Sequence, residues 1–233
     1  MSLTAYEGRN GIIFGANSFF GREMIEFLSR RHVHLGLIDL DGYADASIAG
    51  IGKKYGTTSI YRMVTVASEN AFRSAVEEIG NTLGDIDYLI CSYYLEDLRA
   101  KIDAEDLSPE TWDTVFEEWL VSYFLVMKAA VPRMCGETGG KVVFVTSTAG
   151  YTGEGEGEGE LTDGGSMHES ACSSGITGMM TSIARDSIPR GIAVNGIALG
   201  PDYENDRERI VWATHLWLSG MGDYSCAQIL RLY

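Results

Sequence analysis

The segment between Arg9 and Phe27 constrains the fold more than any other part of the chain, and it reads RNGIIFGANSFFGREMIEF. Its pattern predicts a first strand, a glycine turn and the start of a helix, as in dinucleotide-binding βαβ units. Those units use one glycine for the tight turn, one for backbone approach to the pyrophosphate, and one for packing the helix on the strand. Gly15 and Gly21 stand at the first and third places, and Phe19 stands at the middle one. We therefore expect this turn to keep its role in folding and to lose its role in cofactor binding.

Length and charge narrow the class of protein. The 233 residues, 45% of them hydrophobic, can bury one α/β core, and we interpret residues 1–233 as a single domain. The formal charge of −15 repels phosphate backbones and anionic lipids, so we expect neither a nucleic acid nor a membrane as a partner. The start lacks a basic segment followed by an apolar run, and no stretch reaches the ~18 apolar residues of a membrane span. We expect a cytosolic (cytoplasmic) protein.

Short apolar runs alternate with longer amphipathic ones along the chain, which predicts a parallel sheet with helices on both of its faces. After the first strand, the expected strands are 32–39, 59–66, 86–92, 141–147, 191–198 and 227–233. The expected helices run from the glycine turn to about residue 31, and over 68–83, 108–134, 167–187 and 205–219.

Several polar positions are candidate binding residues. Asp39 follows the glycine turn at the distance where such folds bind the adenosine ribose, although an acid at a strand end is also ordinary loop chemistry. His32 and His34 fall on one face of the expected strand, and we favour a solvated strand start over a metal pair. The cysteines Cys91, Cys135, Cys172 and Cys226 have no C-x-x-C spacing, which predicts reduced thiols without zinc or a disulfide framework.

A Gly-Glu alternation runs over residues 153–160 and places four like charges among four glycines. Such a segment resists packing, so we expect a flexible loop. Cation binding by these glutamates is the alternative.

The order and spacing of these elements resemble the short-chain dehydrogenase/reductase family over almost the whole chain. The matching phrases are FGANSFFG, ETWDTVFEEWLVSYFLVMKAAVPRM, GGKVVFVTSTAG, SSGITGMMTSIARDSIPRGIAVNGIALG and SCAQILRLY. The resemblance implies a doubly wound, Rossmann-like domain with seven parallel strands in the order 3-2-1-4-5-6-7.

Family catalysis rests on an Asn, a Ser, a Tyr and a Lys, and only the Ser is matched, by Ser147. The Asn position falls on Trp119, the Tyr position on Glu169 and the Lys position on Ser173. A glutamate is ionised near neutrality and does not simply replace the phenol as a proton donor. The resemblance therefore implies a degenerate member that lacks the Tyr-x-x-x-Lys motif.

The positions that surround the cofactor in the family are also altered. The floor segment after the fourth strand reads Cys91-Ser92-Tyr93-Tyr94, the usual Asp after the third strand is Thr65, and the Pro-Gly after the sixth strand appears as Leu199-Gly200-Pro201. Only a short stretch then precedes the last helix, where the family carries a longer substrate lid. We assign no catalytic, cofactor-binding or metal-binding residue, and we expect no cofactor.

A serine hydrolase is a further alternative, with Ser147 as nucleophile, His168 as base and Glu169 beside it. Adjacent residues at a helix start point in different directions, and the sequence has no G-x-S-x-G elbow at Ser147. We interpret Ser147 as a residue that caps or fills a strand end.

The expected function is a non-catalytic subunit that supports an active NAD-dependent relative in a hetero-oligomer, with a hydroxyacyl-CoA dehydrogenase of aromatic compound degradation as the family analogy. A divergent oxidoreductase or a ligand sensor is the alternative. Two helices are the expected contact surfaces, together with the last strand. The first carries the large apolar residues Trp112, Phe116, Trp119, Tyr123, Phe124 and Met127, and the second carries the small residues Ala171, Gly175, Gly178 and Ser182.

Overall fold

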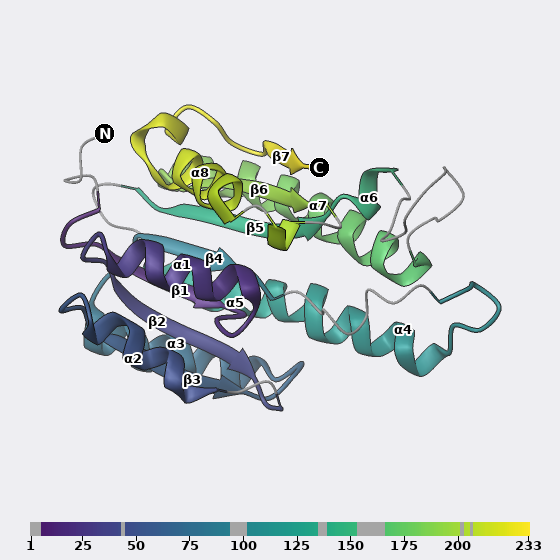
Figure 1. Cartoon of the computed structure of the whole chain (residues 1–233), viewed down its shortest axis with the longest axis horizontal. Helices are drawn as coiled ribbons and strands as arrows, with labels where there is room; N and C mark the ends of the chain where they lie inside the picture. The colour runs from purple at the N-terminus through teal and green to yellow at the C-terminus, as the bar shows by residue number, and fades with distance from the viewer. Residues whose placement is uncertain are drawn as a thin grey trace.

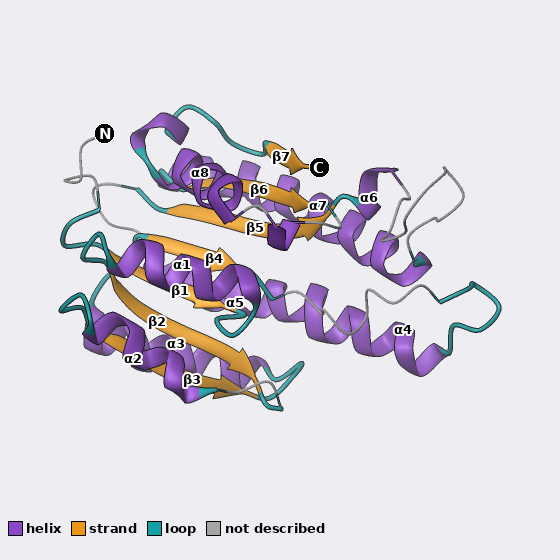
Figure 2. Cartoon of the chain, in the orientation of Figure 1, coloured by secondary structure: helices purple, strands orange, loops and turns teal. Residues whose placement is uncertain are grey.

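The computed structural model describes residues 6–42, 45–93, 102–134, 139–152, 166–200, 203–205 and 207–233. Its centre is one seven-stranded parallel sheet in the order β3-β2-β1-β4-β5-β6-β7 (Figures 1 and 2). The predicted strand order and direction are confirmed. The strands are β1 (Asn10–Phe14), β2 (His34–Leu40), β3 (Ser59–Val64), β4 (Tyr88–Cys91), β5 (Lys141–Ser147), β6 (Ala193–Leu199) and β7 (Ile229–Leu232).

The strand order reverses between β1 and β4, which is the place where open α/β sheets bind ligands. Phe14 pairs with Ile38 on β2 and with Cys91 on β4, so the carboxyl ends of these three strands lie level with one another. The candidate site is built from the side chains that follow them.

Helices cover both faces of the sheet. On one face α1 (Phe19–Ser29) contacts both α2 (Ala49–Lys53) and α8 (Arg207–Leu218). On the other, α3 (Glu69–Leu83) packs on α5 (Ser122–Ala130), and α7 (Met167–Ser187) packs on β5 and β6. In Figure 1, α1 and α8 lie in front of the strands and α7 lies behind them. No helix in the described part of the chain is both long and apolar enough to cross a membrane.

Local sequence signals account for the starts of three helices. The hydroxyls of Ser18, Ser68 and Ser108 accept hydrogen bonds from backbone N–H groups in the first turns of α1, α3 and α4 (Pro109–Val115). Pro109 occupies the first helical position, where its missing N–H costs nothing. The expected helix 167–187 has the same bounds in the structure.

The helix expected over 108–134 contains a change of winding. A π-helical segment, η4 (Phe116–Val121), separates α4 from α5, and a 3₁₀ turn, η5 (Val131–Arg133), ends the helix. Figure 1 shows α4 extending past the carboxyl ends of the strands. Single π turns often mark functional positions.

Two expectations near β2 need correction. The strand begins at His34, because His32 lies in the preceding turn with φ of 62°, so the two histidines do not share a strand face. The backbone N–H of Thr58 donates to Nδ1 of His34 at 3.0 Å. The short helix α2 was not predicted, because its sequence AGIGK has two glycines and no amphipathic period.

The thiols of Cys91, Cys172 and Cys226 are free, and the first two are buried. Burial raises the pKa of the Cys172 thiol to about 12. Within the ranges that the structure describes, no group of three or more His, Cys, Asp or Glu side chains is arranged to hold a metal ion. Cys135 and the Gly-Glu segment 153–160 lie outside the described residues.

Candidate functional site

The two glycines of the first turn, Gly15 and Gly21, have structural roles. Gly15 has a φ of +78°, and a Cβ atom added to it would lie 2.2 Å from the backbone nitrogen of Tyr93. A Cβ atom on Gly21 would lie 2.2 Å from the carbonyl oxygen of Gly15. Contacts this short exclude any side chain, so Gly15 permits the tight turn and Gly21 permits the close approach of α1. Both expectations agree with the structure.

Phe19, at the middle position, is the first residue of α1 and is partly buried. Its ring meets the ring of Tyr203 edge to face, with centroids 5.8 Å apart. The guanidinium carbon of Arg207 lies 5.2 Å from the Phe19 ring centroid. The first turn of α1 is therefore in contact with the segment that precedes α8.

Asp39 lies at the end of β2 and is engaged by the chain itself. Its carboxylate accepts hydrogen bonds from the Asn17 backbone N–H at 3.1 Å and from the Asn17 side-chain amide at 2.7 Å. Burial raises the pKa of Asp39 to about 6, although the bonds from Asn17 and Tyr61 act to lower it. Arg22 in turn donates to Oδ1 of Asn17 at 2.8 Å. Asn17 was not singled out from the sequence, although its position in the glycine turn, facing the end of β2, was a usable signal.

Aromatic residues occupy the end of β4. Tyr93 is 4% exposed, and its ring stacks on Phe14 with centroids 5.5 Å apart. Its hydroxyl donates to Glu118 at 2.8 Å. The buried hydroxyl of Tyr123 lies 2.9 Å from the carbonyl oxygens of both Tyr93 and Val145. These contacts fix Tyr93 against the sheet, and Tyr94 lies outside the described residues.

Ser92 lies beside Tyr93 and is bound to the glycine turn. Its hydroxyl is 3.0 Å from the carbonyl oxygen of Phe14 and 3.1 Å from that of Gly15. The end of β4 is thus tied to the end of β1 by a side chain as well as by the sheet.

The positions that align with the catalytic residues come from elements that contact one another. Trp119 is buried in η4, Ser147 ends β5, and Glu169 and Ser173 are buried in α7, which packs on both η4 and β5. The Ser147 hydroxyl accepts a hydrogen bond from the Ala149 backbone N–H at 3.1 Å. This is the strand-end contact expected for Ser147. These side chains offer an indole, a carboxyl and two hydroxyls.

The remaining altered positions take part in local contacts. The Thr65 hydroxyl donates to Asp41 at 2.8 Å. The Gly200 backbone N–H donates to the carbonyl oxygen of Leu232 at 2.7 Å, which holds the end of β6 against β7. Pro201 lies outside the described residues.

Comparison with known proteins decides the family. The model of the short chain dehydrogenase family matches residues 10–203. The chain belongs to this family. It is 26% identical over 195 residues to the 3-oxoacyl-[acyl-carrier-protein] reductase of Aquifex aeolicus, covering 83% of this chain and 74% of that protein. It is also 26% identical over 196 residues to the cis-1,2-dihydrobenzene-1,2-diol dehydrogenase of Pseudomonas putida, covering 83% and 66%.

Solved structures show the same fold. A short-chain dehydrogenase/reductase from Serratia marcescens superimposes with a TM-score of 0.82 at 18% identity, covering 98% of this chain and 97% of that one. The doubly wound architecture of this family member is therefore established.

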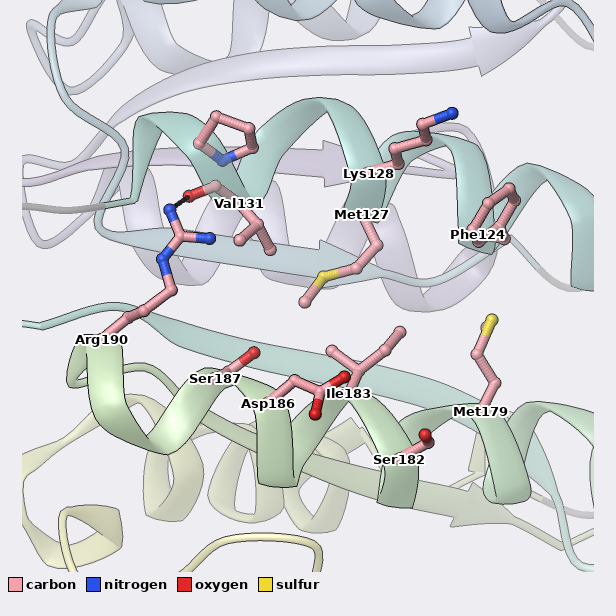
Figure 3. Close-up of a pocket in the computed structure, with 11 residues that line it drawn as sticks. Phe124, Met127, Lys128, Val131, Met179, Ser182, Ile183, Asp186, Ser187 and Arg190 are labelled. Carbon is pink, nitrogen blue, oxygen red and sulfur yellow. Dashed lines mark hydrogen bonds between the residues drawn. The ribbon is translucent and has the colours of Figure 1, made fainter.

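A second candidate site is a groove between α5 and α7, which we call the helix face (Figure 3). It encloses about 520 Å³. Figure 3 shows Met127, Met179 and Ile183 directed into the space between the two helices. Arg190 closes one end, where it donates to the Val131 carbonyl oxygen at 3.2 Å. The lining residues are Phe124, Met127, Lys128, Val131, Pro132, Met179, Ser182, Ile183, Asp186, Ser187 and Arg190.

The small residues predicted on α7 do not all face the same neighbour. A Cβ atom on Gly175 would lie 3.2 Å from Leu120 of the chain's own η4, whereas one on Gly178 would meet nothing within 4 Å. Gly178 and Ser182 are exposed, and Phe124 across the groove is 47% exposed. The sequence missed Met179 and Ile183, because periodicity identifies the residues that share a face and not the neighbour that the face meets.

Proposed function

We propose that this chain is a non-catalytic subunit that supports an active, NAD-dependent short-chain dehydrogenase in a hetero-oligomer. The observation that carries the proposal is the set of side chains at the positions aligned with the catalytic residues. Trp119, Glu169 and Ser173 supply neither a phenol to exchange a proton nor an ammonium group to lower its pKa. Nowhere in the sequence does a tyrosine precede a lysine by four residues.

The region where the family holds its nucleotide supports the same proposal. Phe19 places a benzyl group at the closest approach to the pyrophosphate, and Asp39 is already hydrogen-bonded to Asn17. Tyr93 is packed on Phe14 where the family has small residues. These residues do not fit a dinucleotide, so we propose no cofactor for this chain and derive no chemical step through one.

The properties of the helix face are consistent with the binding of a partner. Its groove is apolar at the centre, and Phe124 and Met179 lie at the end opposite Arg190 (Figure 3). Two of its charged residues are positive and one is negative, so it adds little repulsion in a chain whose formal charge is −15. Exposed apolar surface beside an open glycine is suited to close contact with another helix. We propose that an active relative binds here, in a cytoplasmic complex that also uses the last strand.

The substrate class of the complex is a further part of this proposal. We favour a hydroxyacyl-CoA in the breakdown of aromatic compounds, which rests on family analogy. One relative is named for a dihydrodiol of benzene, and others are named for an oxoacyl thioester of a carrier protein. The first name refers to a compound derived from an aromatic ring and the second to an acyl group, so each shares one feature with the proposed substrate class.

Assembly tests the proposal directly. The chain is purified in two ways: alone, and after co-expression with a relative that is encoded by a neighbouring reading frame and has an intact Tyr-x-x-x-Lys motif. The mass of each preparation is then measured by size-exclusion chromatography with light scattering. We expect a hetero-oligomer in the second preparation. Gly178→Trp should block it while the chain stays folded, because the indole would clash with the partner helix.

Gly50→Trp is the matched control for that variant. Gly50 is also an exposed helical glycine with nothing within 4 Å of an added Cβ atom, but it lies on α2 on the opposite face of the sheet. The Gly50 variant should assemble normally. A chain that stays monomeric in both preparations, with Gly178→Trp behaving like Gly50→Trp, would contradict the proposal.

A divergent oxidoreductase or ligand sensor is the second candidate, and one observation favours it. The Ser173 hydroxyl is buried and has no hydrogen-bond partner among the described residues, so its hydrogen-bonding capacity is available to a bound polar group. In that case the unmutated chain, supplied with NAD or NADP, would oxidise alcohols, and Glu169→Gln would abolish the activity. Absence of turnover in both proteins would favour the silent subunit.

A further inference from the structure

The contact between the start of α1 and the segment before α8 joins parts of the chain that are far apart in sequence. Phe19 and Tyr203 meet edge to face, at an interplanar angle of 71°, and Tyr203 is only 6% exposed. Aromatic pairs in this arrangement are more stable than their buried area alone accounts for. Tyr203 begins η7 (Tyr203–Asn205), directly before α8.

Arg207, the first residue of α8, adds a second connection to the same helix. Its guanidinium group lies over the Phe19 ring, and its NH1 atom is 3.2 Å from Oε1 of Glu23. Phe19 and Glu23 are four residues apart and so share one face of α1. A single cation therefore contacts two side chains of that face. We call Phe19, Tyr203 and Arg207 the latch.

The far end of α8 is held by different contacts. The indole N–H of Trp217 donates to the Gly196 carbonyl oxygen at 3.0 Å, which attaches this end to β6. The ring of His215 accepts or donates a hydrogen bond at 2.6 Å with the hydroxyl of Tyr6. Because these contacts do not involve the latch, loss of the latch should free the start of α8 and leave its end in place.

We propose that the latch holds η7 and the start of α8 against the first turns of α1 without any nucleotide. The ring that stands at the position of the missing glycine also supplies the contact that holds this segment. The position of α8 then does not depend on a bound ligand. This inference concerns the chain alone, so it is independent of whether the helix face binds a partner.

Hydrogen–deuterium exchange of the full-length chain tests the latch. In Phe19→Ala, amides of residues 207–212 should exchange about threefold to tenfold faster, the range that corresponds to the loss of one aromatic pair. Amides of residues 216–219 should keep their rates and act as an internal reference. Phe124→Ala, which removes an exposed ring on the other face of the sheet, should change neither set.

Arg207→Gln provides a second variant that does not endanger folding, since the Arg207 side chain is 68% exposed. It should accelerate the same amides of residues 207–212 by a smaller factor, and NADH at 1 mM should not slow them in the unmutated chain. Unchanged exchange at residues 207–212 in both variants would overturn the proposal. An equal increase along the whole of α8, or protection by NADH, would overturn it as well.

Discussion

Two regions of the molecule differ in how many packing and hydrogen-bonding contacts their side chains make within the chain. One is the carboxyl edge of β1, β2 and β4, and the other is the helix face of α5 and α7. At the strand edge, Tyr93 stacks on Phe14 and Asp39 binds Asn17. On the helix face, Phe124 is 47% exposed and the space above Gly178 is open. Filling an apolar space stabilises a chain, by about 24 cal/mol per Å³ in core substitutions. Under the proposed function, the strand edge is free to fill because it needs no room for a ligand, whereas the helix face has to stay open for a partner.

The glycines provide the largest expected contrast between the two regions. Gly15→Ala should lower the free energy of unfolding by about 3 kcal/mol or more, because the new Cβ atom would meet the Tyr93 backbone at a strained φ. Chemical denaturation followed by circular dichroism measures the change. The matched control is Gly178→Ala, where a helical glycine in open space gives way to a better helix former. It should raise stability by up to about 1 kcal/mol. Similar losses for both variants would contradict the contrast.

The second prediction concerns pH and the buried carboxyl of Asp39. Its pKa in the folded chain is about 6, above the ordinary value of about 3.9, so the folded state binds more protons than the unfolded state between these values. Asp39 therefore makes stability fall as pH rises from about 4 to about 6, by at most about 3 kcal/mol. Denaturation midpoints should be measured from pH 4 to 7 for the unmutated chain and for Asp39→Asn. As pH rises, the midpoint of the unmutated chain should fall relative to that of Asp39→Asn.

Asp45 serves as the control for that titration. Hydrogen bonds from Ser47, together with Arg22, lower the pKa of its exposed carboxyl, so its contribution to stability is lost as pH falls. Asp45→Asn should therefore reverse the sign of the difference. An Asp39→Asn profile parallel to that of the unmutated chain would show that the Asp39 carboxyl is not buried as described.

The third prediction removes one buried hydroxyl from the filled edge. Tyr123→Phe leaves the carbonyl oxygens of Tyr93 and Val145 without this donor, and it should cost about 1–2 kcal/mol. Tyr224→Phe is the control, because Tyr224 is fully exposed, and it should change stability by less than about 0.5 kcal/mol. Equal effects in urea denaturation would mean that the Tyr123 hydroxyl is already bonded to solvent.

The smallest expected effect is that of a nucleotide. Calorimetric titration of the chain with NADH and with NADPH should give no saturable heat below about 1 mM, corresponding to a binding free energy weaker than about −4 kcal/mol. Phe19 and Tyr93 provide the physical reason, since a benzyl group and a stacked phenol stand where backbone and small residues should meet the cofactor. Binding at micromolar concentration with one nucleotide per chain would show that the strand edge is open.

The sequence predicted the architecture well because each strand and each long helix carries its own pattern, which the short helix α2 lacks. The strand order and the bounds of α7 are confirmed, and Gly15 and Gly21 have the close contacts expected of them. The site was less predictable. Two features depend on which element lies opposite another: the hydrogen bonds between Asn17 and Asp39, and the fact that Gly175 faces Leu120 whereas Gly178 faces open space. Periodicity along one segment carries no information about the element that it faces.

The π turn η4 has a consequence for how this chain tolerates changes in length. Successive residues of an α-helix are about 100° apart around its axis, so one extra residue in a turn rotates everything beyond it by that amount. In η4 the extra residue is accommodated within Phe116–Val121, where Trp119 is buried. Loss of a single residue there could be absorbed by converting the turn to α-helix, with Trp112 and Phe124 each keeping its own orientation. The same loss within α5 would turn Phe124 away from the groove. Changes in the length of this helix should therefore be tolerated at η4 and not within α5.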